Sequence, residues 1–204
     1  MNQKRFQKRF QKGFQIVELV VSLAVMGLVL ALGAPPLLRT SSELRLFLAT
    51  QDLVGVLRLT RSYAIRHSAN VAVKFRTARD GTVTFTLYRD GDGDGVLTRD
   101  IDAGIDPQVK PPRRLVHLGR GFGFGFPPGP PPRDPSSNRP MDRLDDPIRF
   151  NQSDLASFDP LGTATPGSLY LTDRRSLLAA VRVTSRRGRV RVIRYDPRAR
   201  VWRE

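Results

Sequence analysis

The residues from Phe14 to Pro35 form the stretch that most constrains how this chain can fold. Apart from one acid, Glu18, they are apolar or small and uncharged, and Glu18 is the only charged residue between Phe14 and Leu38. A helix needs about 20 mostly apolar residues to cross the hydrocarbon core of a bilayer. The sequence therefore predicts a membrane-spanning helix over residues 14–38.

A basic leader precedes this predicted helix. Residues 1–13 contain no acid and carry five cations, at Lys4, Arg5, Lys8, Arg9 and Lys12. Positive charge beside a membrane span stays on the cytoplasmic side. We therefore expect a cytoplasmic N-terminus, with residues 39–204 on the opposite side of the membrane.

The junction between leader and span carries a specific motif. Gly13 is followed by Phe14, and Glu18 is the fifth residue after the glycine. This junction resembles the N-terminus of the type IV prepilin family, which includes type IV pilins and the pseudopilins of type II secretion. The resemblance implies that prepilin peptidase cleaves between Gly13 and Phe14, that the new amine of Phe14 is methylated, and that Pro35 is the helix-bending proline of the family.

The resemblance also implies a role for the acid. A charged side chain in hydrocarbon costs about 2.5–3.5 kcal/mol on insertion scales, so an intramembrane carboxylate needs a partner. The family offers the N-terminal ammonium of a neighbouring subunit. Glu18 would then set the axial stagger of subunits in a filament.

Two simpler interpretations compete with this one. A secretory signal would use the small residues 31–34 as its cleavage region, but its apolar part is typically about 7–15 residues long and carries no acid. A plain membrane anchor that never joins a filament would explain the length but not the Gly13–Phe14 junction. A mature N-terminus at Phe14, near Pro35 or at Met1 distinguishes the three.

Composition limits the remaining possibilities. The chain has no cysteine, which excludes a disulfide framework, a thiolate zinc site and a cysteine nucleophile. The formal net charge is +15, and residues 174–204 hold eleven arginines against two acids, Asp196 and Glu204. Charge gathered at one end of a chain points to an anionic partner or surface.

The residues after the span predict an α+β head. An apolar stripe of Leu44, Phe47, Leu48, Val54, Leu57, Ala64 and Ile65 indicates a helix that begins near Ser41 or Ser42 and ends near His67. Alternating apolar residues over 71–75 and 83–87, separated by Asp80-Gly81, then predict a β-hairpin. A long helix packed on an antiparallel sheet follows, with residues 39–204 as a single head domain.

The rest of the head alternates loops with short strands. We expect an acidic loop over 90–107, a short strand over 115–118, and a long exposed proline-rich loop over 111–140. Further strands are predicted over 148–150, 169–172, 179–184 and 190–195, the last two joined by an Arg187-Gly188 turn.

These C-terminal segments extend the resemblance. The stretches 158–162, 167–171, 180–183 and 188–192 look like the C-terminal sheet of the GspH/FimT branch of the family. The resemblance implies a GspH-like minor pseudopilin that assembles into the type II secretion pseudopilus. Its partners would be other minor and major pseudopilins, prepilin peptidase, the inner membrane and the secretion-system assembly platform.

One group of acids has the spacing of metal ligands. Asp90, Asp92 and Asp94 stand at alternate positions before Gly95, as in the first half of a calcium loop. Ile101 occupies the place of the bidentate acid, with Asp100 and Asp102 on either side. The five aspartates predict a calcium site, and the competing interpretation is a solvated Asp-Gly loop.

The arginine-rich end supports an alternative function. Basic residues interleaved with aromatics suit phosphate contact and base stacking. A FimT-like minor type IV pilin would use such a face for DNA uptake or act in pilus priming, and the candidate DNA-binding residues are Arg186, Arg187, Arg189, Arg191 and Arg194. The competing interpretation is the polar face of an amphipathic strand.

No pattern indicates catalysis. His67 and His117 stand in no recognisable catalytic motif, and no glycine-rich phosphate loop or nucleophile elbow occurs. We therefore expect a structural protein with no certain cofactor apart from the calcium that the aspartates suggest.

Overall fold

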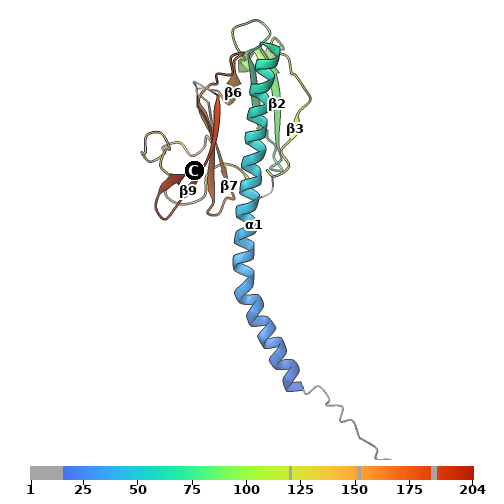
Figure 1. Cartoon of the computed structure of the whole chain (residues 1–204), viewed down its shortest axis with the longest axis vertical. Helices are drawn as coiled ribbons and strands as arrows, with labels where there is room; N and C mark the ends of the chain where they lie inside the picture. The colour runs from blue at the N-terminus through green and yellow to red at the C-terminus, as the bar shows by residue number, and fades with distance from the viewer. Residues whose placement is uncertain (1–15, 120, 151–152, 185–187) are drawn as a thin grey trace, which may run out of the picture. The chain divides into compact units, whose positions relative to one another are not determined.

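The computed structural model describes the backbone of residues 16–119, 121–150, 153–184 and 188–204, and the side chains of these residues except 31–39. The chain divides into two units, residues 1–41 and residues 42–204. Helix α1 (Ile16–His67) contributes to both units, and all of the β-strands belong to the second (Figure 1). The predicted α+β class is confirmed, because a long N-terminal helix precedes and packs on antiparallel sheets.

Helix α1 has no break at the two prolines. It runs through Pro35 and Pro36, so the prediction of a new helix capped by Ser41 or Ser42 is wrong. A proline removes one backbone donor and crowds the preceding turn, which can kink a helix without ending it.

The buried face of α1 differs from the predicted stripe. Val54, Leu57 and Ala64 are buried as predicted, whereas Leu44, Phe47 and Ile65 are exposed. Apolar residues occur on more than one side of this helix, so spacing alone could not select the side that packs. The rest of the buried face consists of Leu46, Ala49, Thr50, Leu53, Val56 and Thr60.

Two threonines complete that face. The hydroxyl of Thr50 donates to the carbonyl oxygen of Phe47 at 2.7 Å, and the hydroxyl of Thr60 donates to that of Val56 at 2.8 Å. These bonds back to the helix satisfy both hydroxyls, so they can be buried without an unpaired polar group.

The predicted hairpin is confirmed as β1 (Val71–Thr77) and β2 (Val83–Arg89), with Phe75 opposite Phe85. In the turn, the backbone N–H of Thr82 donates to Asp80, and Gly81 has a φ of 83° that glycine tolerates without strain. β3 (Arg113–Arg114) and β6 (Leu155–Phe158) complete a four-stranded antiparallel sheet in the order β3-β2-β1-β6.

The second sheet is built from the C-terminal strands. β7 (Gly167–Thr172), β8 (Leu178–Thr184) and β9 (Arg189–Asp196) lie within about two residues of the predicted strands, and β5 (Ile148–Phe150) matches its prediction. β10 (Val201–Arg203) and β4 (Gly123–Phe124) extend it in the order β10-β9-β8-β7-β4, with β5 also paired to β7. The predicted turn residue Arg187 lies outside the described residues.

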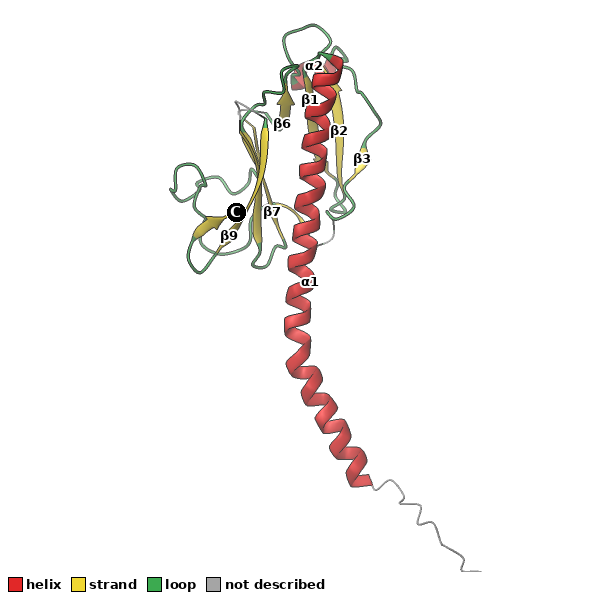
Figure 2. Cartoon of the chain, viewed as in Figure 1, coloured by secondary structure: helices red, strands yellow, loops and turns green. Residues whose placement is uncertain are grey.

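One core joins these elements. It contains Leu53 and Leu57 of α1 together with Val73 of β1, Leu169 of β7 and Val181 of β8. Within the second unit, α1 therefore packs on both sheets, and Figure 2 shows it running beside them. A smaller cluster, formed by Met141, Tyr170, Leu178, Ala180 and Ile193, covers the other face of the larger sheet.

Two loop predictions need correction. The region 111–140 is not simply an exposed loop, because Leu115, Leu118 and Phe122 are buried in the main core. The short strand expected over 115–118 falls instead at Arg113–Arg114, where it pairs with β2. Edge pairing and apolar burial hold this segment although its proline and glycine content favours a loop.

The acidic loop is the second correction. Residues 90–107 contain a short helix, α2 (Thr98–Ala103), which ends at Gly104 with a φ of 77°. A six-residue helix is too short to leave a clear periodic pattern, so it could not be predicted from the sequence.

Candidate functional site

The processing motif lies largely outside the described residues. Gly13 and Phe14 both belong to the part that the structure does not describe. Glu18 lies in the first turn of α1 and is exposed, and Pro35 lies within the same helix. The large apolar side chains from Ile16 to Leu30 are also exposed, each by at least half of its surface. Among the described residues, no helix combines the length and the apolar character needed to cross a membrane.

The acidic loop brings three predicted ligands together. One side-chain oxygen from each of Asp90, Asp92 and Asp94 lies within 4.8 Å of the others. Asp90 shapes the loop, because its carboxylate accepts hydrogen bonds from the backbone N–H groups of Gly93 at 2.7 Å and Gly95 at 3.0 Å. The side-chain amide of Asn70 donates to the same carboxylate at 2.8 Å.

The other two predicted ligands do not join this group. Asp100 and Asp102 lie on α2, which turns Asp100 inward until it is 6% exposed and sets it 3.3 Å from the guanidinium of Arg99. Asp102 is exposed. Within the described part of the chain, the group that could hold a cation is therefore Asp90, Asp92 and Asp94, and calcium binding by the five aspartates stays a prediction.

Asp106 was missed by sequence reasoning. It is 1% exposed, and its carboxylate accepts the backbone N–H groups of Gly91 at 3.0 Å and Leu97 at 2.9 Å. It therefore closes the acidic loop at its far end. Its distance along the sequence from Gly91 left no signal by which spacing could have revealed it.

The environments of two loop carboxylates differ. Burial raises the pKa of Asp90, but the hydrogen bonds from Asn70, Gly93 and Gly95 together outweigh it, and the pKa lies below its ordinary value. The pKa of Asp94 is raised by burial and by repulsion from Asp92. The loop thus holds one stabilised carboxylate beside one that is destabilised by its neighbours.

The predicted DNA-binding arginines do not all share one face. Arg186 and Arg187 lie outside the described residues. On β9, Arg189 and Arg191 alternate with Val190 and Val192, which pack against the main core. Arg194 falls on the face of those valines, and its guanidinium stacks over the ring of Phe47 at 5.6 Å.

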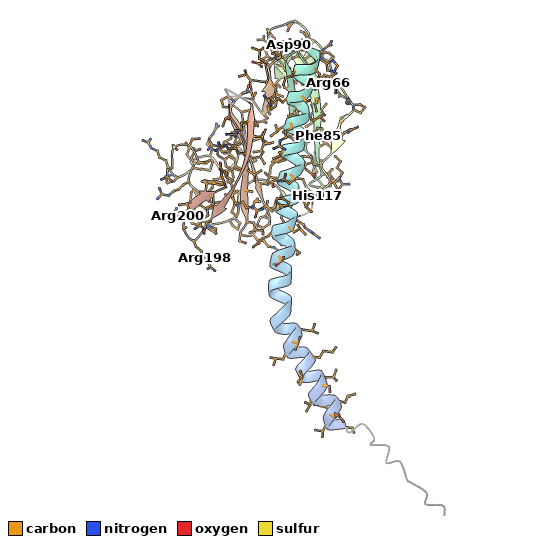
Figure 3. All side chains as sticks on the ribbon, viewed as in Figure 1. Arg66, Phe85, Asp90, His117, Arg198 and Arg200 are labelled. Carbon is orange, nitrogen blue, oxygen red and sulfur yellow. The ribbon has the colours of Figure 1, made fainter. Side chains whose placement is uncertain are left out.

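Ion pairs join some arginines of the C-terminal segment to acids. Arg191 contacts Glu204 at 2.7 Å, and Arg203 contacts Asp196 at 3.0 Å. Arg198 and Arg200 lie in the turn between β9 and β10, well away from Asp90 (Figure 3). Two of the described arginines at this end, Arg191 and Arg203, are therefore each paired with an acid.

The histidine of the proline-rich region has a structural contact. Nδ1 of His117 lies 2.7 Å from a carboxylate oxygen of Asp52 on α1, and the backbone N–H of His117 donates to the same oxygen. This contact ties the region to the helix. It uses the side chain for attachment rather than placing it beside a nucleophile.

Comparison with known families supports one of the functional interpretations. A model of the family described as type II transport protein GspH matches residues 49–194. The chain belongs to the GspH family. The match begins in α1 and ends in β9, so this GspH assignment does not depend on the junction at Gly13. No curated protein and no solved structure gives a match.

Members of the GspH family are minor pseudopilins of type II secretion. The chain is accordingly a structural, non-enzymatic component of that system, as the sequence predicted. Family membership also associates it with the inner membrane and the pseudopilus, and with assembly alongside other pseudopilins.

Proposed function

We propose that this GspH-family chain is made as a prepilin and held in the inner membrane by residues 14–38. Its N-terminus would be cytoplasmic and its head periplasmic, and it would then assemble into the type II secretion pseudopilus. The observation that carries the proposal is the exposed apolar surface of α1 from Ile16 to Leu30, which is continuous with the segment that matches the family. Such a surface is unfavourable in water and needs lipid or neighbouring helices.

Processing prepares this surface for assembly. Prepilin peptidase cleaves between Gly13 and Phe14, and the amine of Phe14 is methylated. Cleavage removes the five leader cations, which would otherwise oppose withdrawal of the helix from the membrane. The new ammonium then pairs with Glu18 of a neighbouring subunit, because a carboxylate in an apolar filament core requires an opposite charge.

The head supplies the contacts that distinguish one minor pseudopilin from another. The match runs from residue 49, in the last third or so of α1, to residue 194 in β9, so it supports a family-specific role for the head. Other minor and major pseudopilins are its expected neighbours, and the assembly platform of the secretion system acts on it from the inner membrane.

Replacement of Glu18 tests this proposal. Glu18→Ala removes the carboxylate that pairs with the neighbouring ammonium, so we expect normal levels in the membrane, loss of cross-links to other pseudopilins, and loss of exoprotein release. Glu43→Ala is the matched control, because Glu43 is an exposed acid on the same helix but outside residues 14–38. Normal cross-linking and secretion by Glu18→Ala would contradict the proposed role.

Mass spectrometry of the purified protein tests the processing step independently. We expect the mature chain to begin at Phe14 with one added methyl group. An intact Met1 would favour a plain anchor, and a start near Pro35 would favour a secretory signal; either result contradicts processing as a prepilin.

DNA uptake by a FimT-like pilin stays an untested prediction. On β9, Arg189 and Arg191 lie on the face opposite to that of Arg194. These three arginines therefore give the DNA-uptake prediction no added support. The pseudopilin proposal does not require nucleic acid.

A further inference from the structure

A second basic site lies on the face of the larger sheet that points away from α1. It is a concave pocket of about 380 Å³ between β5, β7, β8 and the loop at residues 134–136. We call it the arginine pocket and define it by six of its lining residues, Asp134, Ser136, Arg149, Ser168, Tyr170 and Arg182.

The strand register builds this pocket. Arg149 on β5 stands opposite Ser168 on β7, and Ser168 stands opposite Arg182 on β8. Residues directly opposite on neighbouring strands point to the same face of a sheet. Two guanidinium groups therefore flank the small side chain of Ser168, which leaves space between them.

Each arginine is held in place by part of its hydrogen-bonding capacity. Nε of Arg149 donates to the carbonyl oxygen of Asp146 at 2.8 Å, and its guanidinium stacks over the Tyr170 ring at 5.6 Å. The two terminal nitrogens of Arg182 donate to the carbonyl oxygen of Pro135 at 3.3 Å and to the hydroxyl of Ser136 at 2.6 Å.

Each arginine also keeps one donor without an acceptor. Nη2 of Arg149 and Nε of Arg182 are buried and make no hydrogen bond, and they are the only such side-chain atoms among the described residues. A buried donor on a charged group that lacks an acceptor is unfavourable. That both belong to one pocket indicates that an acceptor is missing there.

The acid that lines the pocket does not supply that acceptor. One carboxylate oxygen of Asp134 accepts the backbone N–H groups of Ser136 at 2.8 Å and Ser137 at 2.9 Å. Among the ion pairs of the described residues, none joins Asp134 to Arg182 or to Arg149. Asp134 thus shapes the loop and leaves a net positive pocket.

The geometry points to a carboxylate as the missing acceptor. A carboxylate offers two oxygens in one plane, which suits one N–H from each of two guanidinium groups. Both arginines are only partly buried, so a small rotation of each side chain can turn its free N–H toward an oxygen in the pocket. The negative charge of Asp134 favours a single carboxylate over a doubly charged phosphate.

We propose that the arginine pocket binds the side-chain carboxylate of an aspartate or glutamate from a protein that docks on the outer face of the larger sheet. The choice of a protein as the source rests on the proposed pseudopilin function, whereas the carboxylate chemistry rests on the pocket alone.

Titration of the full chain in a non-ionic detergent tests the carboxylate chemistry. The probe is N-acetyl-glutamic acid α-amide, which carries one side-chain carboxylate, and the control is its neutral glutamine analogue at the same ionic strength. Trp202 is the only tryptophan and its ring centroid lies 6.0 Å from that of Tyr170, so its fluorescence reports on the pocket. The NMR signal of the Arg182 Nε–H reports on the proposed contact directly.

We expect a saturable response to the glutamate probe and none to the glutamine analogue. Arg182→Lys keeps the charge but removes the Nε–H, and we expect it to weaken binding about tenfold or more. Arg149→Gln should weaken it similarly, whereas the exposed Arg175→Gln is the matched control and should bind as the parent does. Thermal unfolding confirms that each variant is folded.

Three results would overturn the proposal. One is an equal response to the glutamine analogue, and another is unchanged binding by both folded pocket variants. The third is tighter binding of inorganic phosphate or of a short oligothymidylate, which would replace the protein carboxylate by a phosphate ligand. The titration needs no other secretion component. Its result is therefore independent of the test of the proposed function, which asks whether deletion of the protein blocks secretion.

Discussion

The indole Nε1 of Trp202 donates a hydrogen bond of 2.6 Å to the carbonyl oxygen of Arg133, which lies 69 residues earlier in the chain. Trp202 also packs against Tyr195 and Tyr170, with ring centroids 5.1 Å and 6.0 Å away. The last strand therefore fastens the proline-rich region to the outer face of the larger sheet. This attachment keeps Asp134 and Ser136 beside the arginine pocket.

Loss of this hydrogen bond should loosen the proline-rich region. Trp202→Phe keeps an aromatic ring but removes the donor, so we expect the free energy of unfolding to fall by about 1 kcal/mol. Faster amide hydrogen exchange should appear in residues 133–141. Val201→Ala, at a partly exposed position on the same strand, is the control and should change stability by less than about 0.5 kcal/mol. Unchanged exchange in Trp202→Phe would contradict the attachment.

Gly167 allows β5 and β7 to approach each other. A Cβ at this position would collide with the ring of Phe150 and with the backbone carbonyl oxygen of Arg149. We expect Gly167→Ala to lower the free energy of unfolding by about 1–3 kcal/mol, because the backbone contact cannot relax by side-chain movement. Denaturant unfolding of the full chain in detergent measures the change.

Gly55 provides the matched control for that substitution. It lies on an exposed face of α1 with no atom within 4 Å of an added Cβ. Gly55→Ala should therefore raise stability by about 0.5–1 kcal/mol, since alanine loses less conformational freedom in a helix than glycine does. Equal changes in the free energy of unfolding for the two substitutions would contradict the claim that Gly167 allows β5 and β7 to approach closely.

The strands were easier to predict from the sequence than the buried face of α1 and the contacts between elements. Alternation marked β1, β2, β7, β8 and β9 because each of these strands has at least six residues with a buried side. The elements α2, β6 and β10 have six residues or fewer and gave no clear period. The buried face of α1 was predicted only in part, because exposed apolar residues such as Leu44 and Phe47 lie on other sides of the same helix.

The two candidate sites also differ in whether the sequence could reveal them. The Asp90, Asp92 and Asp94 spacing is local, so the sequence revealed the group that the structure brings together. The arginine pocket depends on the cross-strand order of Arg149, Ser168 and Arg182, which only the sheet register establishes. Residues that meet through register leave no motif in the sequence.

Calcium binding by the acidic loop stays a prediction, and Asp94 provides its sharpest test. Burial and repulsion from Asp92 raise the pKa of Asp94, so its ionised form disfavours the folded state above that pKa. Asp94→Asn should therefore raise the melting temperature slightly without calcium. Calcium should stabilise the parent chain, by about 2.7 kcal/mol at a hundredfold excess over Kd, but not this variant.

Asp102 supplies the control for the calcium experiment. It lies on α2, outside the group formed by Asp90, Asp92 and Asp94. Asp102→Asn should keep the calcium response of the parent chain. A parent melting temperature that does not change at millimolar calcium would show that the prediction is wrong.

Acid should release the loop that Asp134 holds. Burial raises the pKa of this carboxyl, but the hydrogen bonds from the N–H groups of Ser137 and Ser136 lower it by a larger amount. The folded pKa therefore lies below the ordinary value of 3.8. The ionised carboxylate therefore stabilises the folded state at pH values above 3.8, and this contribution is lost as the pH falls through the lower, folded pKa. The difference in unfolding free energy between the parent chain and Asp134→Ala should shrink on acidification. A constant difference from about pH 6 to about pH 3 would contradict this assignment.

A clean deletion of the gene tests the central claim most directly when exoprotein release, surface pili and DNA uptake are scored in parallel. The pseudopilin account predicts that exoproteins remain in the periplasm while pili and DNA uptake are normal, and that the full chain restores release. Normal secretion together with lost pili or lost DNA uptake would contradict it and make Arg189, Arg191 and Arg194 the next residues to replace.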